Sequence, residues 1–167
     1  MNAAQAYAAA ISGADYGEAY LEETAWTSAR LEDGRVQDVA AGSDRGLGLR
    51  LLRKTGSRVE TFFGSGPDIR PEAAARLRAG LLPPGRKRIM HFSSPVLKGV
   101  TPRIDPARVP LERKVKLLRE LDSIVRSEFP SVRQVTVTYG DRSRSTRVLN
   151  TDGAAARQSL TPVLLSV

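Results

Sequence analysis

The hydrophobic positions between residues 111 and 129 recur at the spacing of an amphipathic α-helix. With 3.6 residues per turn they fall on one broad face of such a helix. Proline stands just before this stretch at position 110 and just after it at position 130. Because proline suits a helix start and prevents continuation, the helix is bounded at both ends. We expect this face to pack on a sheet through Leu111, Val115, Leu118, Leu121, Val125 and Phe129.

Two charged residues, Lys114 and Asp122, interrupt that apolar face. Counted from Leu111, they lie about 60° and about 20° away around the helix. A charge at the edge of a buried face is tolerated when it is paired or when its head reaches solvent. The pattern therefore predicts that at least one of the two has a charged or backbone partner on the neighbouring sheet.

Alternating and β-branched residues predict strands on both sides of this helix. Before the helix we expect an antiparallel meander with strands at 16–31, 35–41, 46–53 and 58–63, joined by turns at Asp33-Gly34, Gly42-Ser43 and 54–57. After the helix we expect strands at 132–139 and 146–149 with a turn at 140–143, then a turn at 150–153 and a last strand-like run at 158–167.

Two shorter helices are expected at residues 3–11 and 71–79, and a Pro/Gly-rich irregular segment at 81–104 contains Arg86-Lys87-Arg88 and His91. The predicted fold class is therefore α+β, with antiparallel β-meander sheet packed by one long amphipathic helix and one or two shorter helices. We expect one domain over residues 1–167, with subregions 1–80 and 105–167 joined by the irregular segment.

The final run of the chain is apolar on both faces of any strand that it forms. A strand of this kind needs cover on both sides, and a bare apolar edge can pair with another copy of itself. We therefore expect self-association or a partner subunit at this edge, and the run looks cut rather than finished. The candidate assembly residues are Leu160, Val163, Leu164, Leu165 and Val167.

Composition narrows the classes of function. The 167 residues are 41% hydrophobic and carry 26 Lys plus Arg against 18 Asp plus Glu, a net charge of +8. This charge permits phosphate binding. Arg142 and Arg144 share a strand face, an arrangement that could follow a phosphate backbone. Aromatic residues are only 5% of the chain, and none alternates with these arginines or with Arg147 to stack bases. A small basic nucleic-acid-associated module therefore stays the alternative function.

The chain has no cysteine, which fits a reducing cytoplasm. No apolar run approaches the roughly 20 residues of a membrane helix, and the start lacks the pattern of a signal peptide. We therefore expect a cytoplasmic protein without membrane contact.

Catalytic chemistry has few candidate residues. His91 is the one histidine, so a metal site of three or four His, Cys or carboxylate ligands is not indicated. No Gly-x-Ser-x-Gly elbow precedes a helix. The acidic pairs Glu22-Glu23 and Glu32-Asp33 do not indicate an acid/base pair. Adjacent residues of a strand point to opposite faces, and a carboxylate in a turn usually stabilises the turn. The glycines of 45–50 precede a β-run rather than a phosphate-binding helix, and they favour a strand face left bare for close approach. No catalytic or metal-binding residue is assigned. A self-contained enzyme is a third hypothesis, and no group of catalytic residues in the sequence supports it.

The order of several short motifs resembles the amino-terminal domain of the TldD/PmbA family, once labelled modulators of DNA gyrase and now regarded as metallopeptidases. The resemblance spans nearly the whole chain except residues 80–102, and its helix, its Thr-Asp-Gly turn and its ending look closer to the TldD branch. The matching stretches are 13–18, 22–24, 31–34, 45–50, Asp105-Pro106, 114–122, 150–153 and 161–167.

The resemblance implies a limited function for this chain. Family members bind a catalytic metal, zinc by implication, through a His-Glu-x-x-x-His helix in a carboxy-terminal domain, and that motif is absent here. No catalytic residue can be carried over, and no cofactor is expected in this chain. The expectation is a non-catalytic amino-terminal domain that helps dimer assembly with itself or a TldD/PmbA-type subunit and encloses unfolded peptide substrates.

Overall fold

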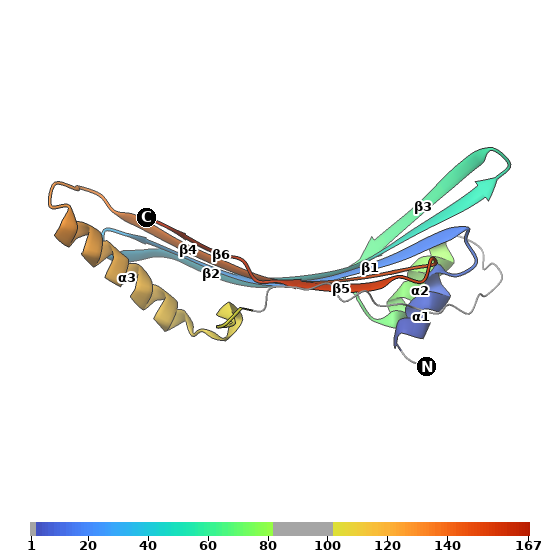
Figure 1. Ribbon diagram of the computed structural model, residues 1–167, viewed down its shortest axis with the longest axis horizontal. Coiled ribbons are helices and arrows are strands. Elements are labelled where there is room, and N and C mark those ends of the chain that lie inside the picture. The colour runs from blue at the N-terminus through green and yellow to red at the C-terminus, as the bar shows by residue number, and fades with distance from the viewer. Residues whose placement is uncertain (1–2, 82–101) are drawn as a thin grey trace. The chain divides into compact units, whose positions relative to one another are not determined.

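The computed structural model describes residues 3–81 and 102–167 of the chain (Figure 1). Most of the predicted irregular segment, with Arg86-Lys87-Arg88 and His91, lies outside the described residues. The elements are α1 (Ala3–Ile11), β1 (Tyr16–Glu32), β2 (Arg35–Thr55), β3 (Arg58–Gly66), α2 (Pro71–Leu81), the short 3-10 helix η1 (Pro106–Arg108), α3 (Leu111–Glu128), β4 (Thr136–Asn150), β5 (Ala155–Leu160) and β6 (Val163–Ser166).

The strands form an antiparallel sheet in the order β3-β2-β1-β4-β5, and β6 also pairs with β4. The predicted α+β class is confirmed, and the three predicted helices are present as α1, α2 and α3. Three of the predicted turns are confirmed as well, at Asp33-Gly34, 54–57 and 150–153. Asp33 and Gly34 have φ angles of 48° and 73°, Gly56 has a φ of 63° and Gly153 has a φ of 89°, the left-handed region that such turns use.

The predicted turn at Gly42-Ser43 is wrong, because β2 continues through it as one strand. Gly42 lies against the ring of Trp26, and a Cβ atom built on Gly42 would stand 2.8 Å from that ring. This glycine therefore permits the close approach of an aromatic side chain rather than a chain reversal.

The predicted turn at 140–143 is also wrong, and β4 begins at Thr136 rather than at 132. Gly140 pairs with Leu164 and Asp141 pairs with Val163 in the ladder between β4 and β6. Turn-forming residue types are therefore held in extended backbone by pairing with a strand that lies more than 20 positions away along the chain.

The predicted last strand is divided into β5 and β6 by residues 161 and 162. Pro162 has no N–H to give to a ladder, so the strand stops before it. Its carbonyl oxygen accepts a hydrogen bond of 3.1 Å from the Arg142 backbone N–H, and β6 begins at the next residue.

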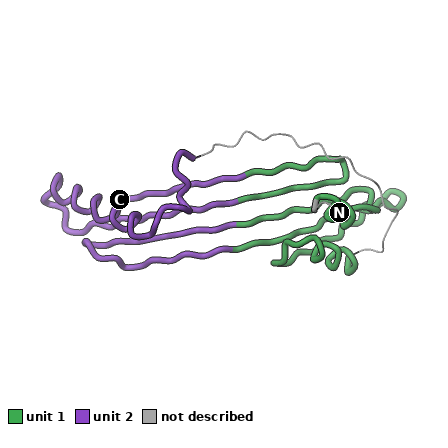
Figure 2. The backbone as a smooth tube through the Cα atoms, turned by 90° about the horizontal axis from the view of Figure 1, so that it is seen from below, with its two compact units in different colours: residues 1–23, 44–99, 145–158 green, residues 24–43, 100–144, 159–167 purple. Residues whose placement is uncertain are grey.

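The chain divides into two compact units, coloured separately in Figure 2. Unit 1 contains residues 1–23, 44–99 and 145–158, and unit 2 contains residues 24–43, 100–144 and 159–167. The units are interleaved along the sequence and do not coincide with the subregions 1–80 and 105–167.

Unit 1 has a core in which α1 and α2 contact each other and pack on strand residues. Gly17 at the start of β1 makes this packing close, because a Cβ atom there would stand 2.3 Å from the Ile11 carbonyl oxygen. The Gly17 N–H donates to Thr151 Oγ1 at 3.0 Å, which ties the start of β1 to the turn after β4. The buried cluster is Tyr7, Ala8, Ala10, Ile11, Ala19, Leu21, Leu47, Leu49, Leu51, Ala73, Ala74 and Leu149.

Unit 2 has a smaller core beneath α3. Its buried residues come from β1, from α3, and from β4 and the segment just before it. Leu118 is the fully buried side chain that α3 contributes. The cluster is Ala29, Leu31, Leu118, Val135, Val137 and Tyr139, with Leu121, Val125 and Val132 packed against it.

Candidate functional site

The two charged residues on the predicted apolar face of α3 are buried in unit 2. Lys114 Nζ donates to Asp141 Oδ2 at 2.5 Å, and both side chains are 4% exposed. The Lys114 ammonium also lies 5.4 Å from the centre of the Tyr139 ring. Burial raises the pKa of Tyr139, and hydrogen bonding to the Asp141 carboxylate raises it further. The prediction that Lys114 or Asp122 has a partner on the sheet is therefore confirmed by Lys114.

Asp122 belongs to a second charged cluster, at the turn between β1 and β2. Arg126 Nε donates to Asp122 Oδ2 at 3.2 Å, and another nitrogen of the same guanidinium donates to Asp33 Oδ1 at 2.5 Å. The Val135 N–H also donates to Asp33 Oδ1, at 3.0 Å. This backbone hydrogen bond and the hydrogen bond from Arg126 both lower the pKa of Asp33. The turn of one hairpin is thus held by helix α3 and by the segment before β4.

The predicted core residues of α3 occupy different environments. Leu118 is buried, Val115 is half-buried, and Leu121 and Val125 pack against the unit 2 core. Leu111 and Phe129, at the two ends of the predicted face, are 37% and 60% exposed. The buried face is therefore shorter than the apolar pattern, because the helix ends extend past the core.

The candidate assembly residues lie at the end of β5 and in and just after β6, and all of them are exposed. Their exposed fractions run from 44% at Leu160 and Leu165 to 65% at Leu164. Strand β6 pairs with β4 on one side through residues 163–166. Successive side chains of a strand point to opposite faces, so both faces of β6 present apolar groups.

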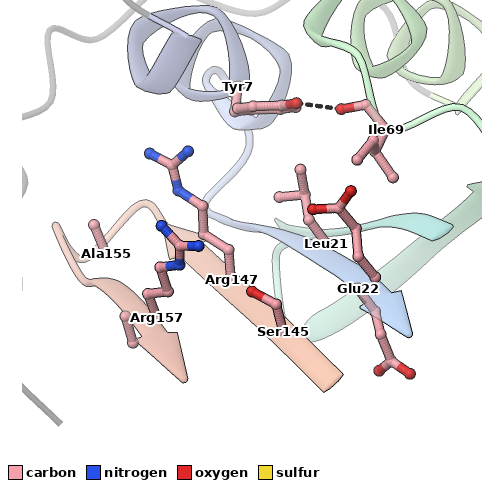
Figure 3. Close-up of a pocket in the computed structure, with 10 residues that line it drawn as sticks. Tyr7, Leu21, Glu22, Ile69, Ser145, Arg147, Ala155 and Arg157 are labelled. Atoms are coloured by element: carbon pink, nitrogen blue, oxygen red, sulfur yellow. Dashed lines mark hydrogen bonds between the residues drawn. The ribbon is translucent and has the colours of Figure 1, made fainter. Parts of the chain in front are cut away.

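A second candidate site lies in unit 1, in a cavity of about 470 Å³. Its lining combines an apolar part, which includes Tyr7, Leu21 and Ile69, with the charged residues Arg147 and Arg157. Figure 3 shows the two arginine side chains extending to the same side of the sheet as Tyr7. The Tyr7 hydroxyl donates to the Ile69 carbonyl oxygen and closes one wall. The remaining lining residues are Glu22, Glu23, Ser145, Ala155 and Ala156.

Sequence reasoning missed this cavity because its charges come from three strands. Arg147 was grouped with Arg142 and Arg144, but Arg147 faces the unit 1 cavity, whereas the other two belong to unit 2. The adjacent pair Glu22-Glu23 is divided, since Glu22 accepts a hydrogen bond from the Tyr20 hydroxyl of its own strand face. The available signal was the two-residue spacing between Arg147 and Leu149, which places Arg147 on the same strand face as that core residue.

The glycines of 45–50 leave a strand face open, as predicted. Leu47 and Leu49 are buried in the unit 1 core. On the opposite face, a Cβ atom at Gly48 would stand 3.6 Å from the ring of Phe63, so the ring lies on the bare backbone. The stretch is part of β2, and no helix follows it there to form a phosphate loop.

Metal ligands do not gather in the described part of the chain. Among residues 3–81 and 102–167, no group of three or more His, Cys, Asp or Glu side chains could hold a metal ion. The described residues therefore do not provide the ligands of a catalytic zinc, and no zinc chemistry is assigned to them. No helix in those same ranges is long and apolar enough to cross a membrane.

Comparisons with known proteins match both halves of the chain to one family. Residues 17–77 match the family model described as PmbA/TldA metallopeptidase domain 1. Residues 104–167 match the model of the PmbA/TldA metallopeptidase central domain.

Solved structures share the same fold. A putative modulator of a DNA gyrase from Thermotoga maritima superposes with a TM-score of 0.68 at 16% identity, over 90% of this chain and 34% of that one. A putative modulator of DNA gyrase from Bacteroides thetaiotaomicron gives 0.63 at 18%, over 97% and 38%. TldE from Thermococcus kodakarensis gives 0.63 at 13%, over 91% and 35%. The chain therefore spans a little over a third of the length of these proteins.

The fold and both family matches define the class of the chain as the amino-terminal part of a PmbA/TldA-type protein. The chain belongs to the TldD/PmbA family, as its ordered motifs indicated. The assignment to the TldD branch within that family stays a prediction.

Proposed function

We propose that this chain is a non-catalytic, cytoplasmic amino-terminal domain of a TldD-like metallopeptidase, and that it serves assembly and the enclosure of peptide substrates. The observation that carries the proposal is the exposed apolar strand at residues 160–167. Leu164 is 65% exposed and Val163 is 51% exposed, although β6 is ordered by pairing with β4.

An edge strand with apolar side chains on both faces favours association with another protein surface. In unit 2, β6 pairs with β4 alone among the described strands, so its other edge keeps backbone groups available for pairing. The simplest occupant is a second subunit of the same family, joined about a two-fold axis. Zinc chemistry belongs to the His-Glu-x-x-x-His motif of full-length relatives and is not proposed for this chain.

Light scattering over a concentration series tests the assembly. The wild-type chain is expected to show a mass above its 18.1 kDa monomer. Leu164→Lys should restore the monomer without loss of folding, because the side chain is already exposed and lysine at an edge strand opposes pairing. Val59→Lys is the matched control, since Val59 is 62% exposed in β3 of unit 1 and should leave the mass unchanged.

Two results would contradict the assembly proposal. One is a wild-type chain that stays monomeric at the highest concentration reached. The other is a Leu164→Lys variant that associates as strongly as the wild type.

The enclosure of peptides has a separate test. An unstructured, fluorescein-labelled peptide should gain anisotropy when titrated with the assembled chain and should gain less with the Leu164→Lys monomer. Equal binding by the two forms would separate peptide binding from assembly and would remove the enclosing role from the proposal.

A further inference from the structure

The cavity of unit 1 holds charges of both signs on neighbouring strands. Glu23 lies on β1, Arg147 on β4 and Arg157 on β5, and these strands are consecutive in the sheet. Leu21, Leu149 and Ala155 stand two positions from these residues; the two leucines belong to the unit 1 core and Ala155 packs against it. Because side chains alternate along a strand, the three charged groups point to the same face of the sheet as that core.

These three charged side chains have no side-chain partner among the residues that the structure describes. Within residues 3–81 and 102–167, none of Glu23, Arg147 and Arg157 forms a side-chain hydrogen bond or a salt bridge. Arg50, Arg70 and Arg76 of the same unit differ in this respect, since Arg50 binds Glu18 and the other two bind Asp68. The cavity therefore keeps two guanidinium groups and one carboxylate available to a ligand.

Charges of both signs act on the Tyr7 hydroxyl in the wall of the cavity. Burial raises the pKa of Tyr7, the Arg147 guanidinium opposes that rise, and the carboxylates of Glu72, Asp68 and Glu23 add to it. The Tyr7 hydroxyl is already committed to the Ile69 carbonyl, so Tyr7 contributes its ring to the wall. The apolar part of the wall is completed by Leu21 and Ile69.

We propose that this cavity binds a small zwitterion, an amino acid or a very short peptide, with its carboxylate on Arg147 and Arg157 and its ammonium group on Glu23. A guanidinium offers two parallel N–H donors that match the two oxygens of a carboxylate. A carboxylate such as that of Glu23 accepts hydrogen bonds from an ammonium group. A volume of about 470 Å³ lies within the range of small-ligand pockets.

This site deepens the peptide-handling part of the proposed function, and its test does not depend on assembly. A chain that stays monomeric but binds the ligand would contradict the assembly proposal and support the binding site. A chain that assembles but binds no zwitterion would do the reverse.

Titration of the full chain with four probes, followed by amide chemical shifts and calorimetry, measures the site. The probes are Ala-Ala, N-acetyl-Ala-Ala, Ala-Ala amide and free alanine. Ala-Ala should bind most tightly among the dipeptides and should shift amides at residues 21–23, 145–147 and 155–157. Loss of either terminal charge should weaken binding about tenfold or more, the usual cost of a lost hydrogen bond to a charged group. Free alanine against Ala-Ala separates an amino-acid site from a peptide site.

Variants assign the roles. Arg147→Gln and Arg157→Gln should each weaken Ala-Ala about tenfold, and Arg157→Lys should also weaken it, because lysine keeps the charge but loses the planar fork. Glu23→Gln should weaken Ala-Ala but not N-acetyl-Ala-Ala. Arg58→Gln, an exposed arginine outside the cavity, is the matched control and should change nothing.

Three results would overturn the site. They are no binding of Ala-Ala or alanine at millimolar concentration, binding that all cavity variants retain, and tighter binding of inorganic phosphate than of any carboxylate probe. Arg157 is exposed, so its variants are expected to fold, and an unchanged far-UV spectrum confirms this before each titration.

Discussion

Lys114 of α3 and Asp141 of β4 form a salt bridge with an Nζ–Oδ2 distance of 2.5 Å in which each side chain is 4% exposed. Removing one partner of such a pair leaves an unpaired charge in the core. Lys114→Met should therefore lower the free energy of unfolding by about 3–5 kcal/mol, measured by urea denaturation.

The double variant Lys114→Met/Asp141→Leu should recover a large part of that loss, since no charge is then left unpaired. Lys116→Met is the matched control, because Lys116 is exposed and its nitrogen lies 3.8 Å from Glu120. Its expected cost is below about 1 kcal/mol. Equal decreases in the free energy of unfolding for Lys114→Met and Lys116→Met would show that the buried pair contributes no more to stability than an exposed one.

Gly17→Ala should destabilise unit 1. Its new Cβ atom would stand 2.3 Å from the Ile11 carbonyl oxygen, so α1 or β1 has to shift. Forced overpacking of this kind costs about 1–3 kcal/mol. Gly66→Ala is the control, because nothing lies within 4 Å of its Cβ position, and it should stay within about 0.5 kcal/mol of the wild type. A neutral Gly17→Ala would mean that the packing of α1 on β1 is looser than described.

Stability should fall in acid partly through Asp33. Its pKa in the folded chain lies below the ordinary value because the Val135 N–H and Arg126 both hydrogen-bond to its carboxylate. A lowered folded pKa gives stability that is present above the unfolded pKa of about 3.9 and is lost as pH falls through the folded value. Asp33→Asn should therefore make the decline of stability in acid less steep.

Asparagine is the conservative choice at this position, because it tolerates the φ of 48° and keeps an oxygen for the Val135 N–H. Urea denaturation at neutral pH and near pH 3 measures the effect. Asp38→Asn, on an exposed part of β2, serves as the comparison. An acid decline in Asp33→Asn as steep as that of the wild type would exclude the carboxylate as its source.

The chain on its own should bind no zinc tightly and cleave no peptide. It has one histidine and no cysteine, and residues 3–81 and 102–167 contain no cluster of three ligand side chains. A structural or catalytic zinc needs three or four such ligands. Stoichiometric zinc in elemental analysis after purification without chelators, or peptide cleavage that a chelator stops, would contradict this expectation.

Local spacing was enough to predict one member of the buried pair but not the other. Lys114 was placed on the inner face of α3 because helical periodicity alone decides which residues share a face. Asp141 was assigned to a turn, because the Gly-Asp-Arg-Ser composition favours turns. Its extended backbone depends on pairing with β6, and its burial depends on Lys114 of a separate helix.

The charged cavity could not be predicted for a related reason. Glu23, Arg147 and Arg157 meet only because β1, β4 and β5 are neighbours in the sheet. Their separations in sequence carry no signal of that order. Gly42 shows the same limit, since its role depends on the ring of Trp26 and not on the residues beside it.

The contact between Trp26 and Gly42 gives the chain a built-in optical reporter. Trp26 is the one tryptophan of the 167 residues, and both contact residues belong to unit 2. Intrinsic fluorescence excited at the indole band therefore reports the unfolding of unit 2 alone, whereas far-UV circular dichroism reports both units. Coincident transitions by the two probes would indicate that the units unfold together, and separated transitions would resolve the stability of each unit without any label.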